Sequence, residues 1–303
     1  MSDITILDGG MGKELRRIGA PFRQPEWSAL ALMEAPDAVV QAHRNFIDAG
    51  AQVVTTSNYA VVPFHLGDER FERIGVELTD RAGRLAREAA TESSRDVLVA
   101  GSLPPLFGSY EPDSFDAERA APIYRDIVRA LTPHVDLWMA ETLSSIAEMD
   151  TIVAALGDVG TTAPIWMACA VPNSFVDGVP AMRSGDTVGQ IADAIATRHG
   201  VVEAVLVNCS LPEQTGPALH ALRRALDAHE LTHVRTGGYA NAFPDESPSG
   251  YRANQAIFER REELTGEHYA DIVATWVDDG ATIVGGCCDM YPEHIAAVAA
   301  RVG

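Results

Sequence analysis

Four cysteines are the residues of this chain best suited to do chemistry. They are Cys169, Cys209, Cys287 and Cys288, in a sequence of 303 residues. A long chain with so few cysteines is not expected to have a disulfide framework, and metal binding or catalysis is the commoner use. Cys169 lies in the apolar stretch IWMACAV and is interpreted as a packing residue. The other three are predicted to bind one Zn²⁺ ion, because zinc prefers thiolates in a tetrahedral shell.

Three thiolate ligands leave the fourth position of a tetrahedral zinc ion open for substrate. Both members of the Cys287–Cys288 pair can bind if the backbone turns sharply, and Gly285 and Gly286 are expected to supply the conformational freedom for that turn. A thiol that coordinates zinc is deprotonated, and three further thiolates keep it electron-rich. Zinc hydrolases use neutral histidine ligands to acidify water, and the nine histidines here show no HExxH spacing. The ligand set therefore favours thiol activation.

Two other uses of this zinc site stay open. A zinc-dependent lyase or hydrolase on the same scaffold would act without any added thiol. A zinc or redox sensor would use the cysteine pair as a switch and would show no turnover.

Two carboxylates, Asp8 and Glu141, are the next candidates. They could bind an amino group or serve as general acid and base. The structural alternatives are that Asp8 caps a turn and that Glu141 caps the helix expected to start near Ser145. The segment DGGMG at residues 8–12 can offer backbone N–H groups to a carboxylate. It matches neither GxGxxG nor GxxxxGK(S/T), so nucleotide binding is not expected.

Eight short strands, each followed by a helix, are predicted to position these side chains. The strands are expected at residues 4–7, 52–56, 97–101, 135–140, 165–170, 203–208, 233–237 and 281–285. The helices are expected at residues 36–49, 68–92, 116–131, 145–156, 187–199, 213–229, 267–278 and 292–302. This pattern predicts an α/β fold, a (β/α)8 TIM barrel that forms a single domain over residues 1–303. A doubly wound open sheet is the alternative.

The C-terminal ends of the strands carry the chemistry in such barrels. Asp8, Glu141 and Cys209 end the first, fourth and sixth predicted strands, and Cys287–Cys288 ends the eighth. The polar segment 55–59, TTSNY, follows the second strand. If the predicted strands are right, all these residues rim one mouth.

Composition excludes several other classes of protein. The formal net charge of −20 argues against binding to nucleic acid, which needs basic patches. Lys13 is the only lysine, so an aldolase that uses a lysine Schiff base would have a single candidate. No run approaches 18 uncharged apolar residues, and the N-terminus does not read as a secretory signal. A cytoplasmic protein without a membrane partner is expected.

Several motifs together resemble the zinc-dependent homocysteine S-methyltransferase family, over essentially the whole chain. The matching segments are LDGGMGKEL at 7–15, VVTTSNYAVVPFHLG at 53–67, AGSLPP at 100–105, AETL at 140–143, VNCS at 207–210 and GGCCD at 285–289. VNCS followed by a distant GGCC is the most specific part. The resemblance implies a (β/α)8 barrel that transfers a methyl group to the sulfur of homocysteine and yields methionine.

The same resemblance implies roles for particular residues. The three cysteines 209, 287 and 288 would be the zinc ligands, with Asn208 as a fourth when substrate is absent. Asp8 and Glu141 would hold the amino group of homocysteine, and the backbone near Gly9 and Gly10 would receive its carboxylate.

The chain departs from the family pattern in two places. Lys13 stands where the family often has threonine; it could touch the substrate carboxylate, but an exposed helix position is favoured. The order of Ser57 and Asn58 looks inverted, which affects the donor contacts more than the zinc. Asn58 and Tyr59 are nevertheless predicted to contact substrate.

The methyl donor is expected to be a cation, which suits an aromatic or acidic mouth. S-methylmethionine or S-adenosylmethionine is favoured by the length of the chain, which resembles stand-alone enzymes of the family, and betaine is the alternative. Aromatic candidates for the mouth are Tyr59, Phe64, Phe107, Tyr110 and Trp138, although packing is the commoner role for each. The loop 238–255 is predicted to shape the mouth and to act as a lid. The oligomeric state is left open.

Overall fold

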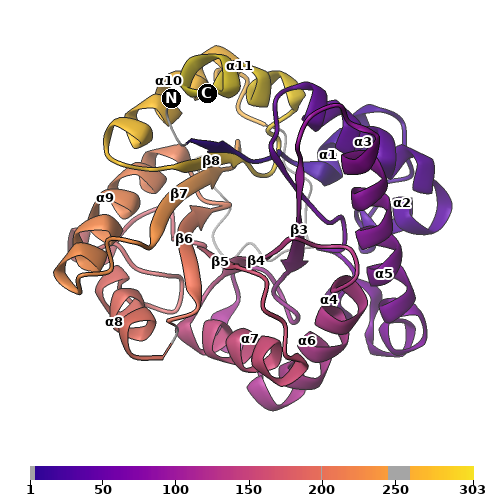
Figure 1. The fold of residues 1–303 in the computed structure, drawn as a ribbon, viewed down its shortest axis with the longest axis horizontal. Helices are drawn as coiled ribbons and strands as arrows, with labels where there is room; N and C mark the ends of the chain where they lie inside the picture. The colour runs from indigo at the N-terminus through magenta and orange to yellow at the C-terminus, as the bar shows by residue number, and fades with distance from the viewer. Residues whose placement is uncertain (1–3, 199, 245–259) are drawn as a thin grey trace.

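A computed structural model describes residues 4–198, 200–244 and 260–303 of the chain. Its eight strands are all parallel and form one sheet in the order β1-β8-β7-β6-β5-β4-β3-β2. A parallel bridge between Leu7 and Val53 joins β1 to β2 and completes the ring. The helices surround this ring (Figure 1). The predicted (β/α)8 barrel is therefore confirmed, and an open doubly wound sheet is wrong.

The strands lie close to where alternating apolar residues predicted them. They are β1 Thr5–Ile6, β2 Val53–Thr55, β3 Leu98–Leu103, β4 Leu137–Leu143, β5 Ile165–Cys169, β6 Val202–Asn208, β7 Arg235–Ala240 and β8 Ile283–Gly286. Two boundaries differ in ways that matter for the site. β4 runs three residues past its predicted end, so Glu141 lies within the strand. β7 runs to Ala240, so the first three residues of the predicted loop 238–255 belong to a strand.

The helices that follow the strands also lie near their predicted positions. The longer ones are α3 Pro36–Asp48, α5 Asp68–Glu92, α6 Ala117–Leu131, α7 Ile146–Val159, α8 Val188–Arg198, α9 Pro212–Ala228, α10 Gly266–Asp278 and α11 Pro292–Val302. The sequence prediction missed α1 Met11–Arg17, α2 Ala29–Glu34, α4 Pro63–Leu66 and two 3₁₀ turns, Pro112–Ser114 and Val176–Gly178. Each of these segments has about two helical turns or fewer, and so short a run shows little of the 3.6-residue period.

Helix starts are fixed by local capping. The Ser145 side chain accepts from the Glu148 backbone N–H, and the Glu148 carboxylate accepts from the Ser145 backbone N–H, which makes a capping box at the start of α7. The Asp116 side chain caps α6 through Glu118 and Arg119. Because Ser145 is the residue that caps α7, the alternative that Glu141 does so is wrong.

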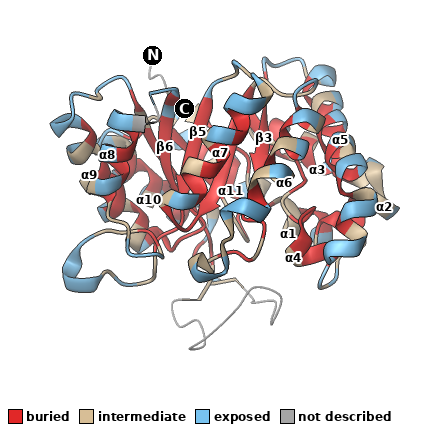
Figure 2. Ribbon diagram, turned by 90° about the horizontal axis from the view of Figure 1, so that it is seen from below, coloured by how far each residue is buried: buried red, intermediate tan, exposed pale blue. Residues whose placement is uncertain are grey.

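The core lies on both faces of the barrel wall. Side chains from alternate strand positions fill the interior, and they include Leu7, Val53, Met139, Trp166, Leu206 and Ile283. Outside the wall, apolar side chains pack between strands and helices, while the outer helix faces are exposed (Figure 2). Among the described residues no helix is long and apolar enough to cross a membrane.

Candidate active site

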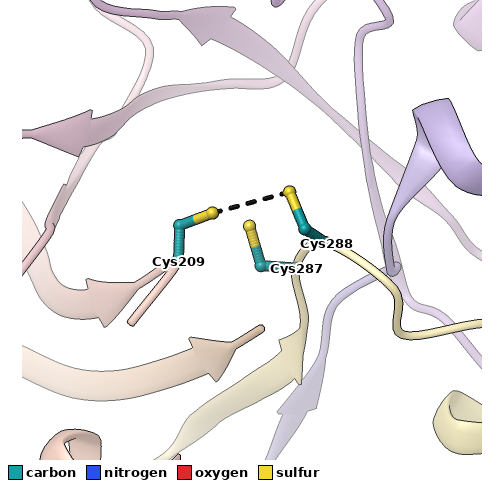
Figure 3. A group of neighbouring side chains, drawn as sticks. All are labelled: Cys209, Cys287 and Cys288. Carbon is teal, nitrogen blue, oxygen red and sulfur yellow. Dashed lines mark hydrogen bonds between the residues drawn. The ribbon is translucent and has the colours of Figure 1, made fainter. Parts of the chain in front are cut away.

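The three predicted zinc-binding cysteines meet at the C-terminal end of the barrel. Cys209 follows β6, and Cys287 and Cys288 follow β8, with β7 between them. Their Sγ atoms all lie within 4.8 Å of one another, and those of Cys209 and Cys288 are 3.7 Å apart (Figure 3). The structure thus brings together three thiols although Cys209 and Cys288 are 79 residues apart along the chain.

The backbone turns that present the thiols differ from the expected ones. Gly285 and Gly286 belong to β8 and do not have a positive φ; a Cβ atom on them would lie 2.5 Å from Leu7 Cβ and 2.4 Å from Met290 Cβ, respectively. They are needed for close packing rather than for conformational freedom, which corrects the sequence interpretation. The left-handed residues are Cys209 itself, with φ of 45°, and Asp289, with φ of 63°.

The electrostatics of the cluster single out one thiol. Hydrogen bonds from Cys287 and Cys288 lower the pKa of Cys209 well below its usual value, and Tyr110 Oη donates a further one to Cys209 Sγ at 2.9 Å. The pKa of both Cys287 and Cys288 is raised, in each case first by its hydrogen bond with Cys209. Cys209 therefore carries the negative charge of the cluster most readily. Tyr110 was only one of several aromatic candidates in the sequence.

Two buried carboxyl groups face the same cavity. Asp8 Oδ2 accepts from the Thr55 backbone N–H at 2.8 Å, and Glu141 Oε1 accepts from Ser102 Oγ at 2.5 Å. Desolvation by burial raises the pKa of Asp8 to about 7 and that of Glu141 to about 8, and the charge of Asp8 contributes to the second shift. Neither carboxyl group ionises readily beside the other in this buried site. A cationic group of a ligand would therefore be favourable here, because it stabilises the ionised carboxylates.

The loop between β1 and α1 packs tightly against the loop that carries the cysteine pair. A Cβ atom on Gly9 would lie 2.4 Å from Met290 O, and one on Gly10 would lie 2.7 Å from Cys287 O. The Gly10 N–H already donates to Met290 O at 2.8 Å, so this group is not open to a ligand carboxylate. Gly9 and Gly10 both line the cavity, but their clearest role is this close approach.

Lys13 does not lie on an exposed helix face, so the favoured interpretation was wrong. Its side chain is 10% exposed, lines the cavity and forms an ion pair with Asp289 at 2.9 Å. The Lys13 ammonium, in the first turn of α1, therefore lies beside Asp289, the residue that follows the Cys287–Cys288 pair.

The segment after β2 contributes differently from the prediction. Tyr59 lines the cavity, as expected, and its hydroxyl lies 2.7 Å from Ser109 Oγ. Asn58 is fully buried and turned away: its side-chain amide donates to Ser102 O and its amide oxygen accepts from Thr56 Oγ1. Ser57 faces the cavity in its place, and its buried hydroxyl has no partner among the described residues. The structure does not bring Asn58 to the site.

Other sequence candidates also lie elsewhere. The Asn208 amide is bonded to Thr142 through both its oxygen and its nitrogen, so it does not face the thiols as a fourth ligand. Cys169 is 2% exposed within the core outside the barrel wall, as predicted. Trp138 is buried in the same core and donates to Thr161. Phe64 and Phe107 are not among the residues that line the cavity. Residues 245–255 of the predicted lid lie outside the described residues.

Several cavity residues were missed by sequence reasoning. They are Phe22, Trp27, His65, Tyr239 and Phe243, which all line the cavity. The first two lie in the segment between α1 and α2, where no element was predicted. Tyr239 lies on β7 at a position that points into the barrel, so a correct end for that strand would have identified it.

The cavity has a volume of about 200 Å³, which suits a small molecule. Thiols, buried carboxyl groups and aromatic walls at the C-terminal mouth define an enzyme of the (β/α)8-barrel class that acts on small molecules.

Comparison with known proteins identifies the family. The profile of the homocysteine S-methyltransferase family matches residues 5–302, and the chain belongs to this family. It is 30% identical to the homocysteine S-methyltransferase of Escherichia coli strain K12, over 99% of this chain and 95% of that protein. It is 25% identical to a selenocysteine methyltransferase of Astragalus bisulcatus, over 97% and 91% of the two chains.

Solved structures agree with these relatives. The homocysteine methyltransferase MmuM of Escherichia coli in its metallated form superposes with a TM-score of 0.78 at 28% identity, over 99% of this chain and 96% of that one. The apo form of the same enzyme superposes with a TM-score of 0.69. The chain is thus a methyltransferase that moves a methyl group to homocysteine, as its sequence motifs predicted.

Proposed function

We propose that the cavity binds homocysteine and a cationic methyl donor, S-methylmethionine or S-adenosylmethionine, beside a Zn²⁺ ion held by Cys209, Cys287 and Cys288. The observation that carries this proposal is the convergence of three thiols and two buried carboxyl groups on one small cavity. No other group of three or more potential metal ligands of this kind occurs among the described residues.

The three thiols fit zinc in type and in spacing. A tetrahedral ion with Zn–S distances of about 2.3 Å places its sulfur ligands about 3.8 Å apart. The Sγ atoms of Cys209 and Cys288 are 3.7 Å apart, and the third lies within the same 4.8 Å limit. Thiolates are also the ligands that select zinc over hard cations such as Mg²⁺. Bound zinc would favour the ionised form of a substrate thiol at neutral pH.

The two carboxyl groups suit the ammonium group of homocysteine. Asp8 and Glu141 are 6% and 9% exposed, and burial raises the pKa of each into or above the neutral range. An ammonium group placed between them would offset the cost of their ionisation and would be held by charge-assisted hydrogen bonds. Ser57 and Tyr239 add two buried hydroxyls that have no partner among the described residues.

The first turn of α1 suits the carboxylate end of the same substrate. The N-terminal N–H groups of a helix have no partners within the helix and carry partial positive charge. Met11, Gly12 and Lys13 line the cavity at this turn, and the Lys13 ammonium, which is paired with Asp289, lies beside it. With the Gly10 N–H engaged by Met290, we assign the carboxylate to this turn rather than to Gly10.

The aromatic part of the cavity lining suits a cationic donor. Phe22 and Trp27 form an edge-to-face pair with ring centroids 5.4 Å apart, and both line the cavity. Aromatic faces attract sulfonium or ammonium groups. In the transfer, the deprotonated sulfur of homocysteine attacks the donor methyl carbon. A new S–CH₃ bond forms while the bond from that carbon to the donor heteroatom breaks, and the donor leaves as a neutral molecule with the electron pair.

The test measures methionine formation by the zinc-loaded protein with homocysteine and, in turn, S-methylmethionine, S-adenosylmethionine and betaine. We expect turnover with one of the first two, and loss of that turnover in Cys209→Ala. Turnover with betaine alone would replace the proposed sulfonium donor with an ammonium donor. Turnover of a thioether or ester without any added thiol would favour the lyase or hydrolase alternative.

A further inference from the structure

Strand β4 contains a β-branched residue in a left-handed conformation. Thr142 has a φ of 60° and is fully buried, and this conformation is a strained one for threonine. It lies where β4 has one residue more than its neighbour: Ala140 pairs with Met167 of β5, but Leu143 pairs with Cys169. Thr142 therefore belongs to a β-bulge, and a bulge redirects the side chains around it.

The bulge determines where Glu141 points. In a regular strand, Ala140 and Leu143 would face opposite sides of the sheet. Here both pack in the same core outside the barrel wall, while Glu141 between them faces the cavity. The extra residue at Thr142 allows Ala140 and Leu143 to face the same side of the sheet. If Thr142 relaxed to an extended conformation, the path of the strand next to Glu141 would change.

Asn208 holds Thr142 in this conformation with two hydrogen bonds. Asn208 Oδ1 accepts from the Thr142 backbone N–H at 3.0 Å, and Asn208 Nδ2 donates to Thr142 Oγ1 at 2.9 Å. Both residues are fully buried, and Asn208 immediately precedes Cys209, which is itself left-handed. The contact crosses from β6 to β4, past the intervening strand β5.

We propose that Asn208 is a positioning residue for the methyl transfer, which clamps the strained bulge at Thr142 so that Glu141 stays aimed at the amino group of the acceptor. The Asn208 side chain links the strand that carries Glu141 to the backbone just before Cys209. It acts through Thr142 and does not touch substrate. This inference rests on the proposed role of Glu141 in binding the ammonium group.

The first experiment compares two acceptors, homocysteine and 4-mercaptobutanoate, which lacks only the amino group. Glu141→Gln measures whether this carboxylate recognises the amine at all. If it does, Asn208→Ala should raise KM for homocysteine about tenfold, equivalent to about 1.4 kcal/mol. The KM for 4-mercaptobutanoate should change less than about twofold in the same variant.

The second experiment is a rescue. Glycine adopts a positive φ without strain, so Thr142→Gly can keep the bulge without the clamp. Because Thr142 also hydrogen-bonds Tyr59, Thr142→Gly alone serves as the reference, and we expect Asn208→Ala added to it to raise KM for homocysteine less than about twofold. Zinc content and thermal unfolding, measured on every variant, check that the site and fold persist.

The outcomes test the amine site and the clamp separately. If Glu141→Gln affects both acceptors equally, the proposed amine site is wrong. If Glu141→Gln discriminates but Asn208→Ala does not, the clamp is wrong. Loss of zinc in Asn208→Ala, with no rescue by Thr142→Gly, would overturn it in favour of a direct role at the metal.

Discussion

The two ends of the barrel treat charged side chains in opposite ways. At the amino-terminal end, the Arg235 guanidinium donates to Thr5 Oγ1 at 2.8 Å and to Thr282 O at 2.8 Å, and lies 5.7 Å from the Trp166 ring centroid. At the carboxyl-terminal end, Asp8 and Glu141 line one cavity, neither forms an ion pair with a described residue, and burial raises the pKa of each.

This difference separates stability from function within one barrel. A buried polar or charged group that is left without partners costs free energy, unless a ligand supplies those partners. Changes to these two carboxyl groups should therefore alter kinetics while leaving stability equal or higher. Changes at the opposite end should do the reverse.

The largest effect is expected at the thiols. Removing a residue that hydrogen-bonds a metal ligand typically costs about 10–100-fold in metal affinity or activity. Removing a ligand itself should cost more, so Cys288→Ala should lose more than about 100-fold in turnover and most of its bound metal. Metal analysis and methionine formation on the same preparation measure both. A variant that kept one zinc per chain and full activity would show that Cys288 is not a ligand.

The carboxyl groups should make stability depend on pH. The pKa of Asp8 rises from 3.8 to about 7 and that of Glu141 from 4.5 to about 8. Because the folded protein binds these protons more tightly than the unfolded chain, their contribution to stability is full below about pH 4 and is lost as pH rises through 7 and 8. The variant Asp8→Asn, Glu141→Gln should unfold at a higher temperature than the parent at pH 9, in the absence of ligand and metal. A lower unfolding temperature at that pH would contradict the assignment.

Arg235 provides the matching test at the other end. Arg235→Met keeps much of the side-chain volume but removes its hydrogen bonds to Thr5 and Thr282. We expect a loss of about 2–4 kcal/mol in the free energy of unfolding, measured by denaturant titration, with KM for homocysteine unchanged. A change in KM without loss of stability would break the division between the two ends.

Cys169 should give the smallest effect. It ends β5, one strand away from Cys209, yet its side chain packs outside the barrel wall, where burial raises its pKa to about 12. Cys169→Ala should cost about 1 kcal/mol in stability and should leave zinc content and kinetics unchanged. Metal loss in this variant would mean that the thiol takes part in the site.

The fold and the metal candidates could be predicted from sequence because their signals are local. Alternating strands and helices predicted the barrel, and GGCCD and VNCS at strand ends predicted the thiol cluster. Asn58 and Lys13 were misjudged because each depends on which way a side chain points. Asn58 turns back to Thr56 and Ser102, while Lys13 turns in to Asp289.

By itself, the sequence determined which residue types end which strands, because local patterns mark where the strands and helices lie. In a (β/α)8 barrel the chemistry lies at the C-terminal ends of the strands. Only the tertiary structure decided that β4 bulges at Thr142 and that Asn208 reaches across to hold it. It also decided that Gly285 and Gly286 serve packing against Leu7 and Met290. These features depend on contacts between segments far apart in the chain, and such contacts leave no periodic trace in either segment.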